Sequence, residues 1–219
     1  MTLKLYFGAG ACSFVPHTLL EVAGAAYEPI AVKLHKQENL GPEYRAINPR
    51  GQVPVLVDGD EVITQILAIV TYLDAKFPES HFLPREPLAR ARVIETLAWM
   101  NNTAHPMFTH VFMPFKFAEN EEARAEIKRF ASAQFAQVLD ELEALARKAA
   151  DAGQPFLAGA HFGPLDPYAL TLLRWGGFAG YDPTKYPALW AHAQKLAAMP
   201  PVARALERER IQLNVYKAG

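Results

Sequence analysis

The chain has 219 residues, 51% of them apolar and 21% charged, with a net charge of −1 and one cysteine. This is the composition of a folded globular protein without the basic excess of a nucleic-acid binder, and a single thiol excludes an intrachain disulfide. No apolar run approaches the roughly 20 residues of a membrane span, and residues 1–7 lack a signal-peptide pattern, so we expect a cytoplasmic protein with neither nucleic acid nor membrane as a partner.

The first third of the chain alternates between strand and helix patterns. Residues 3–7 alternate apolar and polar side chains, which predicts a strand, and residues 13–23 show helical spacing that ends at Gly24. Residues 27–34 predict a second strand, which lies at a sheet edge because Pro29 cannot donate a ladder hydrogen bond. A strand, a helix and a strand in this order favour a parallel crossover unit.

A predicted hairpin and a helix complete this part of the chain. Residues 53–57 and 61–63 predict two strands joined by a tight turn. Residues 64–76 show helical spacing, with Thr64 as the expected N-cap. The predicted order is therefore βαβ followed by ββα, the arrangement of an α/β domain.

The rest of the chain shows helix patterns only. Residues 78–87 hold three prolines and predict a linker. Beyond it, helical spacing occurs over residues 88–112, 121–150, 167–175, 187–199 and 201–210. Pro106 must kink or interrupt the first of these helices. We predict an α/β domain over residues 1–77, a linker over 78–87 and an all-helical bundle domain over 88–219.

The only thiol of the chain, Cys12, lies between the first strand and the first helix, next to Ser13. Free N–H groups at a helix start favour an anion, which predicts a depressed pKa for a reactive thiol at this place. The alternative is a small buried core residue. A dithiol redox protein has its second cysteine where this chain has Val15, so redox chemistry needs a thiol from another molecule.

Two further segments suit a ligand with a peptide backbone and a carboxylate. A cis Val53-Pro54 bond turns the Val53 backbone away from the strand ladder and leaves it for an extended ligand, whereas a trans proline only begins the strand. Gln65 precedes a helix whose N-terminus suits a carboxylate, unless the polar residues there serve only as a cap.

The histidines do not form a metal site. His105 and His110 are about 140° apart around a helix, so they cannot share a metal ion. No other group of His, Cys or acidic residues has ligand spacing, and we predict no metal. The aromatic run from Phe108 to Phe117 favours core or interface over a substrate pocket.

Five motifs occur in a fixed order along the chain. They are Gly10-Ala11-Cys12-Ser13 with Pro16-His17, Asn48-Pro49-x-Gly51-Gln52-Val53-Pro54, the segment from Thr64 to Leu73, Leu165-Asp166-x-Tyr168, and the segment from Tyr186 to Val202. Together they resemble the glutathione transferase superfamily, and the first is similar to the bacterial beta class. The resemblance covers nearly the whole chain and implies a thioredoxin-like first domain followed by an all-helical domain.

The same resemblance implies which residues carry the chemistry. Cys12 matches the beta-class cysteine beside the glutathione sulfur, and Ser13 matches the hydroxyl that serves other members. His105 matches a beta-class histidine near the sulfur. We therefore expect these three residues to be catalytic.

The resemblance also implies a set of residues that bind glutathione. They are Cys12, Lys36, Gln52, Val53, Pro54, Gln65, Ile66, Asn101 and His105. Val53 clasps the cysteinyl part through its backbone, and Gln65 with Ile66 holds the γ-glutamyl group. Asn101 reaches toward the glutathione of a partner subunit. Lys36 takes the place of the basic residue after the second strand, although Gln37 aligns about as well.

Besides Lys36, two further positions depart from the family pattern. Ile66 removes a small or hydroxyl side chain, so that only its N–H remains for the γ-glutamyl carboxylate. One lost hydrogen bond to a charged group costs about 1.5–3 kcal/mol, and the bulk of Ile66 is expected to narrow the site. Gly163 replaces the Ser or Thr of the buried capping box, of which Asp166 remains.

The function that the resemblance implies is that of a homodimeric detoxification enzyme. Its co-substrate is reduced glutathione, whose thiolate is conjugated to a small apolar electrophile or exchanged with a disulfide. Two alternatives stay open. One is a non-catalytic binding or assembly module of the same fold, and the other is a glutathione-dependent isomerase or dehalogenase, because Gln65 also occurs in the isomerase-like pattern.

Overall fold

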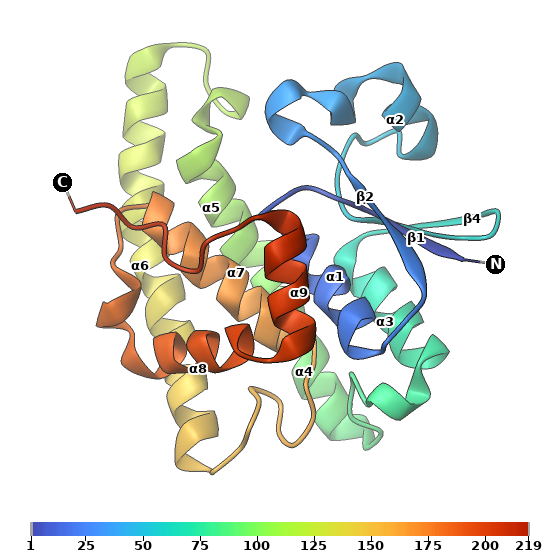
Figure 1. Cartoon of the computed structure of the whole chain (residues 1–219). Coiled ribbons are helices and arrows are strands. Elements are labelled where there is room, and N and C mark those ends of the chain that lie inside the picture. The colour runs from blue at the N-terminus through green and yellow to red at the C-terminus, as the bar shows by residue number, and fades with distance from the viewer. Residues whose placement is uncertain (1, 219) are drawn as a thin grey trace.

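The computed structural model describes residues 2–218, which form one four-stranded sheet followed by helices (Figure 1). The strands are β1 (Leu3–Phe7), β2 (Tyr27–Ala31), β3 (Val55–Asp58) and β4 (Glu61–Thr64), and their order in the sheet is β2-β1-β3-β4. β1 and β2 are parallel and the other pairs are antiparallel. The parallel crossover unit and the edge position of the strand that contains Pro29 are therefore confirmed.

Three helices accompany the sheet. α1 (Phe14–Val22) and α3 (Ile66–Lys76) pack together on one side of it, whereas α2 (Pro42–Ile47) lies on the opposite side, near the top of Figure 1. α2 has only six residues, too few for a recognisable period, and the sequence patterns did not predict it. The thioredoxin-like order of strands and helices is confirmed.

Two boundaries differ from the sequence prediction. β2 ends at Ala31, and residues 34–36 form a 3₁₀ turn instead of continuing the strand. Thr64 is the last residue of β4, where it pairs with Val55, and α3 begins at Ile66. The prediction of Thr64 as the N-cap is therefore wrong, because the strand ladder extends to this residue.

Helices make up the second part of the chain. They are α4 (Pro87–Trp99), a π-helical turn (Met100–Ala104), α5 (His105–Phe112), α6 (Glu121–Asp151), α7 (Leu165–Phe178), α8 (Pro187–Ala197) and α9 (Pro200–Glu209). The π-turn precedes Pro106, so the predicted helix over residues 88–112 is interrupted where the proline requires it. None of the helices within residues 2–218 is both long enough and apolar enough to span a bilayer.

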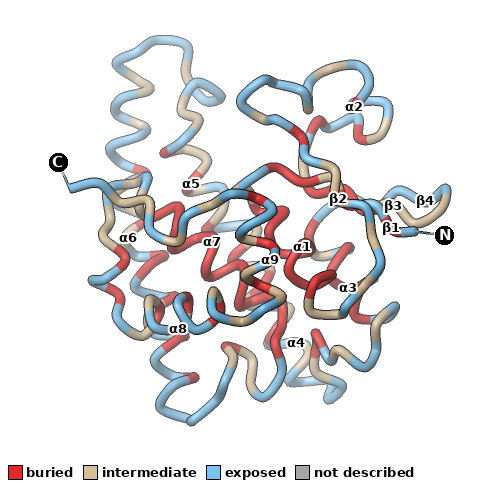
Figure 2. The backbone as a smooth tube through the Cα atoms, viewed as in Figure 1, coloured by how far each residue is buried: buried red, intermediate tan, exposed pale blue. Residues whose placement is uncertain are grey.

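α7 is the central element of the molecule. Its residues from Leu165 to Gly176 are all buried, and Figure 2 shows this helix and α1 in red at the middle of the fold. One continuous apolar core contains side chains of the sheet and of the helices that follow, among them Leu5, Leu73 and Leu172. The loop between β1 and α1 therefore lies against the helical part of the chain.

Candidate functional site

The loop between β1 and α1 is closed by Ser13. The Gly8 N–H donates to Ser13 Oγ at 3.0 Å, and Ser13 Oγ donates to the Gly8 carbonyl oxygen at 3.1 Å. The Ser13 side chain is completely buried. Its hydroxyl is engaged within the loop and does not face the surface, where a ligand would bind.

Cys12 follows this loop and lies against the strand that begins the hairpin. Its Sγ is 3.7 Å from the Val53 carbonyl oxygen, and the residue is 7% exposed. Burial raises the pKa of the Cys12 thiol to about 12, and the negative charge of Glu209 acts in the same direction. The prediction of a depressed pKa is wrong, because lost hydration outweighs the backbone N–H groups at the start of α1.

Val53 offers backbone groups that the sheet does not use. The Val53-Pro54 peptide bond is cis, as one of the two sequence interpretations predicted. β3 begins two residues later, and within residues 2–218 the Val53 N–H has no hydrogen-bond partner. Val53 is half-buried, and its carbonyl side faces the Cys12 thiol.

Hydrogen bonds from α2 and its C-terminal end fix Gln52, the residue that precedes Val53. The carbonyl oxygen of Gln52 accepts the Tyr44 hydroxyl at 2.8 Å and Asn48 Nδ2 at 2.7 Å, while the Gln52 side chain is exposed. Gly51 has a φ of 62°, and a Cβ there would lie 2.8 Å from the Asn39 carbonyl oxygen. The unpredicted helix therefore fixes the backbone that presents Val53.

Gln65 precedes α3 with an uncommon backbone conformation. Its φ of 72° and ψ of 129° are rare for a residue other than glycine, and such residues occur often at ligand sites. The Gln65 side chain is exposed, and the first N–H groups of α3 have no acceptor within the helix. This end of α3 therefore offers both a polar side chain and free backbone donors.

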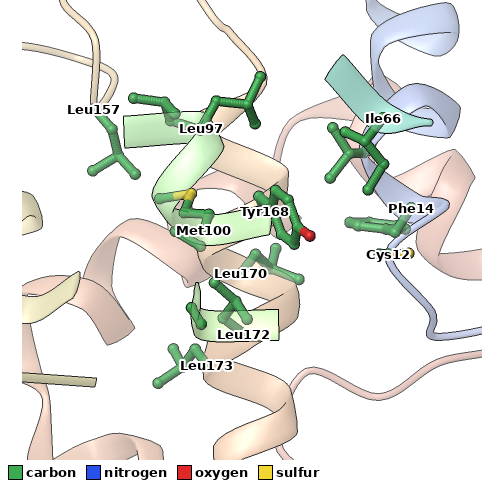
Figure 3. Close-up of a cluster of buried hydrophobic side chains, with 14 of the residues drawn as sticks. Cys12, Phe14, Ile66, Leu97, Met100, Leu157, Tyr168, Leu170, Leu172 and Leu173 are labelled. Atoms are coloured by element: carbon green, nitrogen blue, oxygen red, sulfur yellow. The ribbon is translucent and has the colours of Figure 1, made fainter. Parts of the chain in front are cut away.

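Ile66 does not narrow this end of α3, contrary to the sequence expectation. Its side chain is 3% exposed and belongs to the apolar core, and Figure 3 shows it near Phe14. The backbone N–H of Ile66 remains at the helix start. The departure from the family pattern therefore removes a side-chain contact, while the Ile66 side chain itself lies in the core.

Lys36 lies at the end of a 3₁₀ turn near the same loop. A Cβ on Gly8 would meet Leu34 Cδ1 at 2.6 Å and Val53 Cγ2 at 3.4 Å, so the turn, the loop and Val53 converge around Gly8. The Lys36 side chain is exposed. Leu34 of this turn, two residues before Lys36, is the residue that packs against Gly8.

His105 and Asn101 meet at Tyr168, which the sequence analysis did not select as a site residue. Tyr168 donates its hydroxyl to Asn101 Oδ1 at 3.2 Å, and His105 Nδ1 lies 3.0 Å from the same hydroxyl. The Tyr168 hydroxyl therefore accepts from Nδ1–H, which leaves the lone pair of His105 on Nε2. In Figure 3 the hydroxyl points toward Phe14 and Cys12.

The ionisation states in this group follow from burial. Burial lowers the pKa of His105 to about 4, and the positive charge of Lys116 lowers it further. Burial and the nearby Cys12 hold the pKa of Tyr168 well above its ordinary value. At neutral pH the site therefore holds a neutral imidazole and a protonated phenol.

An aromatic ladder between α5 and α7 leads from the Cys12 loop to the surface. Trp175 Nε1 donates to the Gly10 carbonyl oxygen at 2.9 Å, and the Phe108 ring stacks on Trp175 with centroids 4.6 Å apart. Phe112 continues the stack and lies 5.9 Å from Phe178. The sequence pattern favoured core or interface for the aromatic run from Phe108 to Phe117, but of its four phenylalanines only Phe108 is buried. Phe112, Phe115 and Phe117 are 55%, 58% and 48% exposed, and Phe112 forms an apolar surface with Phe178, which is 48% exposed.

Within residues 2–218 no group of three or more His, Cys, Asp or Glu side chains is arranged to hold a metal ion. His105 and His110 lie on one helix and have different hydrogen-bond partners, Tyr168 and the Pro106 carbonyl oxygen. The groups near Cys12 are instead the Val53 carbonyl and the Tyr168 hydroxyl.

Comparisons with known proteins agree with this arrangement. Residues 1–75 match the family described as glutathione S-transferase, N-terminal domain. The chain is similar to glutathione S-transferase GstA of Escherichia coli O157:H7, with 30% identity over 214 residues that cover 96% of this chain and 100% of the relative.

Two solved structures share the fold over almost the full chain. A glutathione transferase homolog from Sulfitobacter, with bound glutathione, superposes with a TM-score of 0.88 at 26% identity, covering 96% of this chain and 99% of that one. A beta-class glutathione S-transferase of Sphingomonas chungbukensis has a TM-score of 0.78 at 32% identity, covering 94% of this chain and 98% of that one. The likeness therefore includes both the sheet and the helices.

Proposed function

Because the chain belongs to the glutathione S-transferase family, we propose that it binds reduced glutathione along a line from Gln52 through Val53 to Gln65 and transfers the thiolate of glutathione to a small apolar electrophile. A relative described as having bound glutathione shares the fold over 96% of this chain, which supports the proposal. The likeness to a bacterial beta-class transferase supports the same reaction class.

The observation that carries the proposal is the unpaired Val53 N–H beside the Cys12 thiol. An extended tripeptide pairs with such a backbone edge as an added strand does, through one N–H and one C=O. Cys12 Sγ lies 3.7 Å from the Val53 carbonyl oxygen, so the cysteinyl residue of a bound tripeptide places its own sulfur near Cys12. The geometry therefore suits a peptide whose central residue carries a thiol.

The two ends of glutathione fit the two ends of this edge. The γ-glutamyl group carries an amine and a carboxylate, which suit the Gln65 side chain and the free N–H groups at the start of α3. The glycyl carboxylate suits the ammonium group of Lys36, with the exposed Gln52 side chain beside it. Pro54 lies between the Gln52 end and the Gln65 end of this edge, immediately before β3.

The chemical step follows from the ionisation states. The Cys12 thiol stays protonated at neutral pH and acts as a weak hydrogen-bond donor at the glutathione sulfur. The neutral His105 imidazole keeps a lone pair on Nε2, but with a pKa of about 4 it is too weak a base to hold the glutathione thiol proton, which passes to solvent. The glutathione sulfur then attacks the electrophilic carbon, whose leaving group departs with the bonding pair.

The same ionisation states favour conjugation over disulfide exchange as the main reaction. Exchange through the protein needs the Cys12 thiolate, and a pKa of about 12 leaves little of it at neutral pH. Conjugation uses the thiolate of glutathione itself. The exposed rings of Phe112 and Phe178 offer the electrophile an apolar surface at the outer end of the aromatic ladder that begins at the loop.

Calorimetric titration tests this function directly. Reduced glutathione should bind with a dissociation constant between micromolar and low millimolar, and the dipeptide Cys-Gly, which lacks the γ-glutamyl group, should bind at least about tenfold more weakly. No heat of binding up to about 5 mM glutathione, a free energy near −3 kcal/mol, contradicts the proposal.

The proposal includes the organisation of the enzyme. We place the boundary between an α/β domain (residues 1–77) and a helical domain (88–219) at the linker 78–87, and we propose a cytoplasmic homodimer that acts in detoxification. Light scattering should give a mass near twice 24.3 kDa, and a monomer contradicts this part of the proposal.

A further inference from the structure

The Gly10 backbone, two residues before Cys12, is held at its N–H and at its carbonyl oxygen by the helical part of the chain. Glu209 Oε2, at the end of α9, accepts the Gly10 N–H at 2.8 Å. Trp175 Nε1, on α7, donates to the Gly10 carbonyl oxygen at 2.9 Å. Gly10 has a φ of 70°, and a Cβ there would lie 3.2 Å from Arg174 Nη1, so this close approach requires glycine.

Glu209 is a fully buried carboxylate with both oxygens in use. Its Oε1 lies 2.7 Å from His17 Nδ1, and neither side chain is exposed. Arg208 Nη1 lies 3.2 Å from His17 Nε2. A guanidinium group can only donate, so Nε2 accepts and Nδ1–H donates to Glu209. Each carboxylate oxygen of Glu209 therefore takes one donor, and one of the two belongs to the Cys12 loop.

We propose that Glu209 is a positioning residue of the thiol loop, which acts through the Gly10 backbone to hold Cys12 Sγ against Val53. Burying a carboxylate costs free energy unless its oxygens accept hydrogen bonds. A hydrogen bond from a loop N–H to such a carboxylate therefore fixes the position of the loop. The effect that we expect on glutathione binding rests on the function proposed above. The effect that we expect on the reactivity of the Cys12 thiol does not rest on it, because that reactivity is measured in the protein without any ligand.

A second carboxylate separates this role from simple docking of α9. Glu21 on α1 accepts Arg204 Nε at 2.7 Å, Arg208 Nη1 and the Tyr27 hydroxyl. It joins the same two helices, α1 and α9, but among the described residues it contacts nothing in the loop from Gly8 to Ser13. Glu21 is therefore the matched control for Glu209.

The test is the alkylation of Cys12 by iodoacetamide in the native protein without glutathione. Cys12 is the only cysteine of the chain, so the rate reports on one thiol. Glu209→Gln keeps the size of the side chain but has one carbonyl oxygen for two donors, so either Gly10 or His17 loses its acceptor. We expect Glu209→Gln to raise the alkylation rate by roughly tenfold, the scale of one lost hydrogen bond to a charged group. Glu21→Gln should change the rate by less than about twofold, because it leaves the Gly10 contact in place.

Two outcomes overturn the proposal: an unchanged alkylation rate in Glu209→Gln, and an equal rise in Glu21→Gln, which indicates general loosening of α9. Because Glu209→Gln also removes a negative charge that raises the pKa of Cys12, Trp175→Phe is measured beside it. This variant keeps an aromatic ring and every charge but removes the donor to the Gly10 carbonyl, and the same rise is expected there. A rise in Glu209→Gln without one in Trp175→Phe indicates an effect of charge alone and also overturns the proposal. With glutathione present, Glu209→Gln should raise KM by about tenfold, whereas Glu21→Gln should not. A wild-type protein that does not bind glutathione contradicts the proposed function but leaves the alkylation test intact.

Discussion

The imidazole Nδ1 of His105 lies 3.0 Å from the hydroxyl of Tyr168, in surroundings that hold the pKa of His105 at about 4, below its ordinary 6.5. In the unfolded chain this histidine takes up a proton as the pH falls through 6.5, whereas in the folded protein it does so only near pH 4. The folded state therefore binds fewer protons between these values, and its stability falls as the pH falls.

The replacement His105→Asn tests this linkage. Asparagine keeps an N–H donor near the position of Nδ1 but does not titrate. The wild-type free energy of unfolding should lose up to about 3 kcal/mol between pH 7 and pH 4 through this one group, and the variant should lose correspondingly less. Urea denaturation at the two pH values measures the difference. Parallel losses in both proteins show that His105 is not held neutral by burial.

The strands and long helices were predictable because their patterns are local. Residues 3–7 alternate side chains as strands do, residues 61–63 follow a tight turn that returns the chain, and the long helix α6 over residues 121–151 has a clear apolar face. Pro29 and Pro106 mark an edge strand and a helix interruption for reasons that lie in one residue. Such features need no knowledge of distant segments.

The features that were missed depend on contacts between distant segments. The raised pKa of Cys12 comes from burial and from the charge of Glu209, a residue near the other end of the chain. Ile66 appeared to be an obstruction in the motif, but its side chain turns into the core. α2 supports Gln52 through Tyr44, a contact that no local pattern in a six-residue helix could reveal.

Gln65 should contribute to glutathione binding and little to the chemical step. Its side chain is exposed at the free end of α3, where it suits the γ-glutamyl group. We expect Gln65→Ala to raise KM for glutathione by about tenfold with little change in kcat, as for an interaction made equally in the ground and transition states. Steady-state kinetics with varied glutathione measures this. Gln137→Ala, an exposed glutamine on α6, is the control, and an equal effect in both variants contradicts the assignment.

Phe112 and Phe178 should act on the second substrate only. Their rings lie 5.9 Å apart at the exposed end of the aromatic ladder. Removing either ring should weaken the binding of an apolar electrophile by about 1–2 kcal/mol, roughly 5- to 30-fold in its KM, and leave KM for glutathione unchanged. Phe130→Ala removes a similarly exposed ring (59%) from α6 and is the control. A change in KM for glutathione, or an equal effect in Phe130→Ala, places the electrophile elsewhere.

The Cys12 thiol should react slowly and with a steep dependence on pH. Only the thiolate is alkylated, and with a pKa of about 12 its fraction rises about tenfold for each pH unit across the neutral range. The iodoacetamide rate should therefore increase without a plateau between about pH 6 and pH 9, where an ordinary cysteine with a pKa of about 8.5 levels off. A plateau below pH 9 shows that the thiolate is stabilised at the helix start after all.

The substitution Gly163→Ser tests whether the capping hydroxyl of the family pattern fits this fold. The Gly163 N–H donates to Asp166 Oδ2 at 2.8 Å, so half of the capping box is intact. A Cβ on Gly163 would lie 2.9 Å from the carbonyl oxygen of Phe82, a backbone atom that cannot move aside alone. Restoring the usual serine should therefore destabilise the protein by about 1–3 kcal/mol instead of stabilising it.

Two variants at this position separate the clash from the cap. Gly163→Ala adds the Cβ without the hydroxyl, so the stability difference between the alanine and serine variants isolates the capping bond, about 1 kcal/mol. Thermal or urea unfolding should give the order glycine, serine, alanine from most to least stable. A serine variant more stable than wild type shows that residues 81–83 yield to the new side chain. That result means that the contact between Phe82 and residue 163 does not exclude a serine hydroxyl at this position.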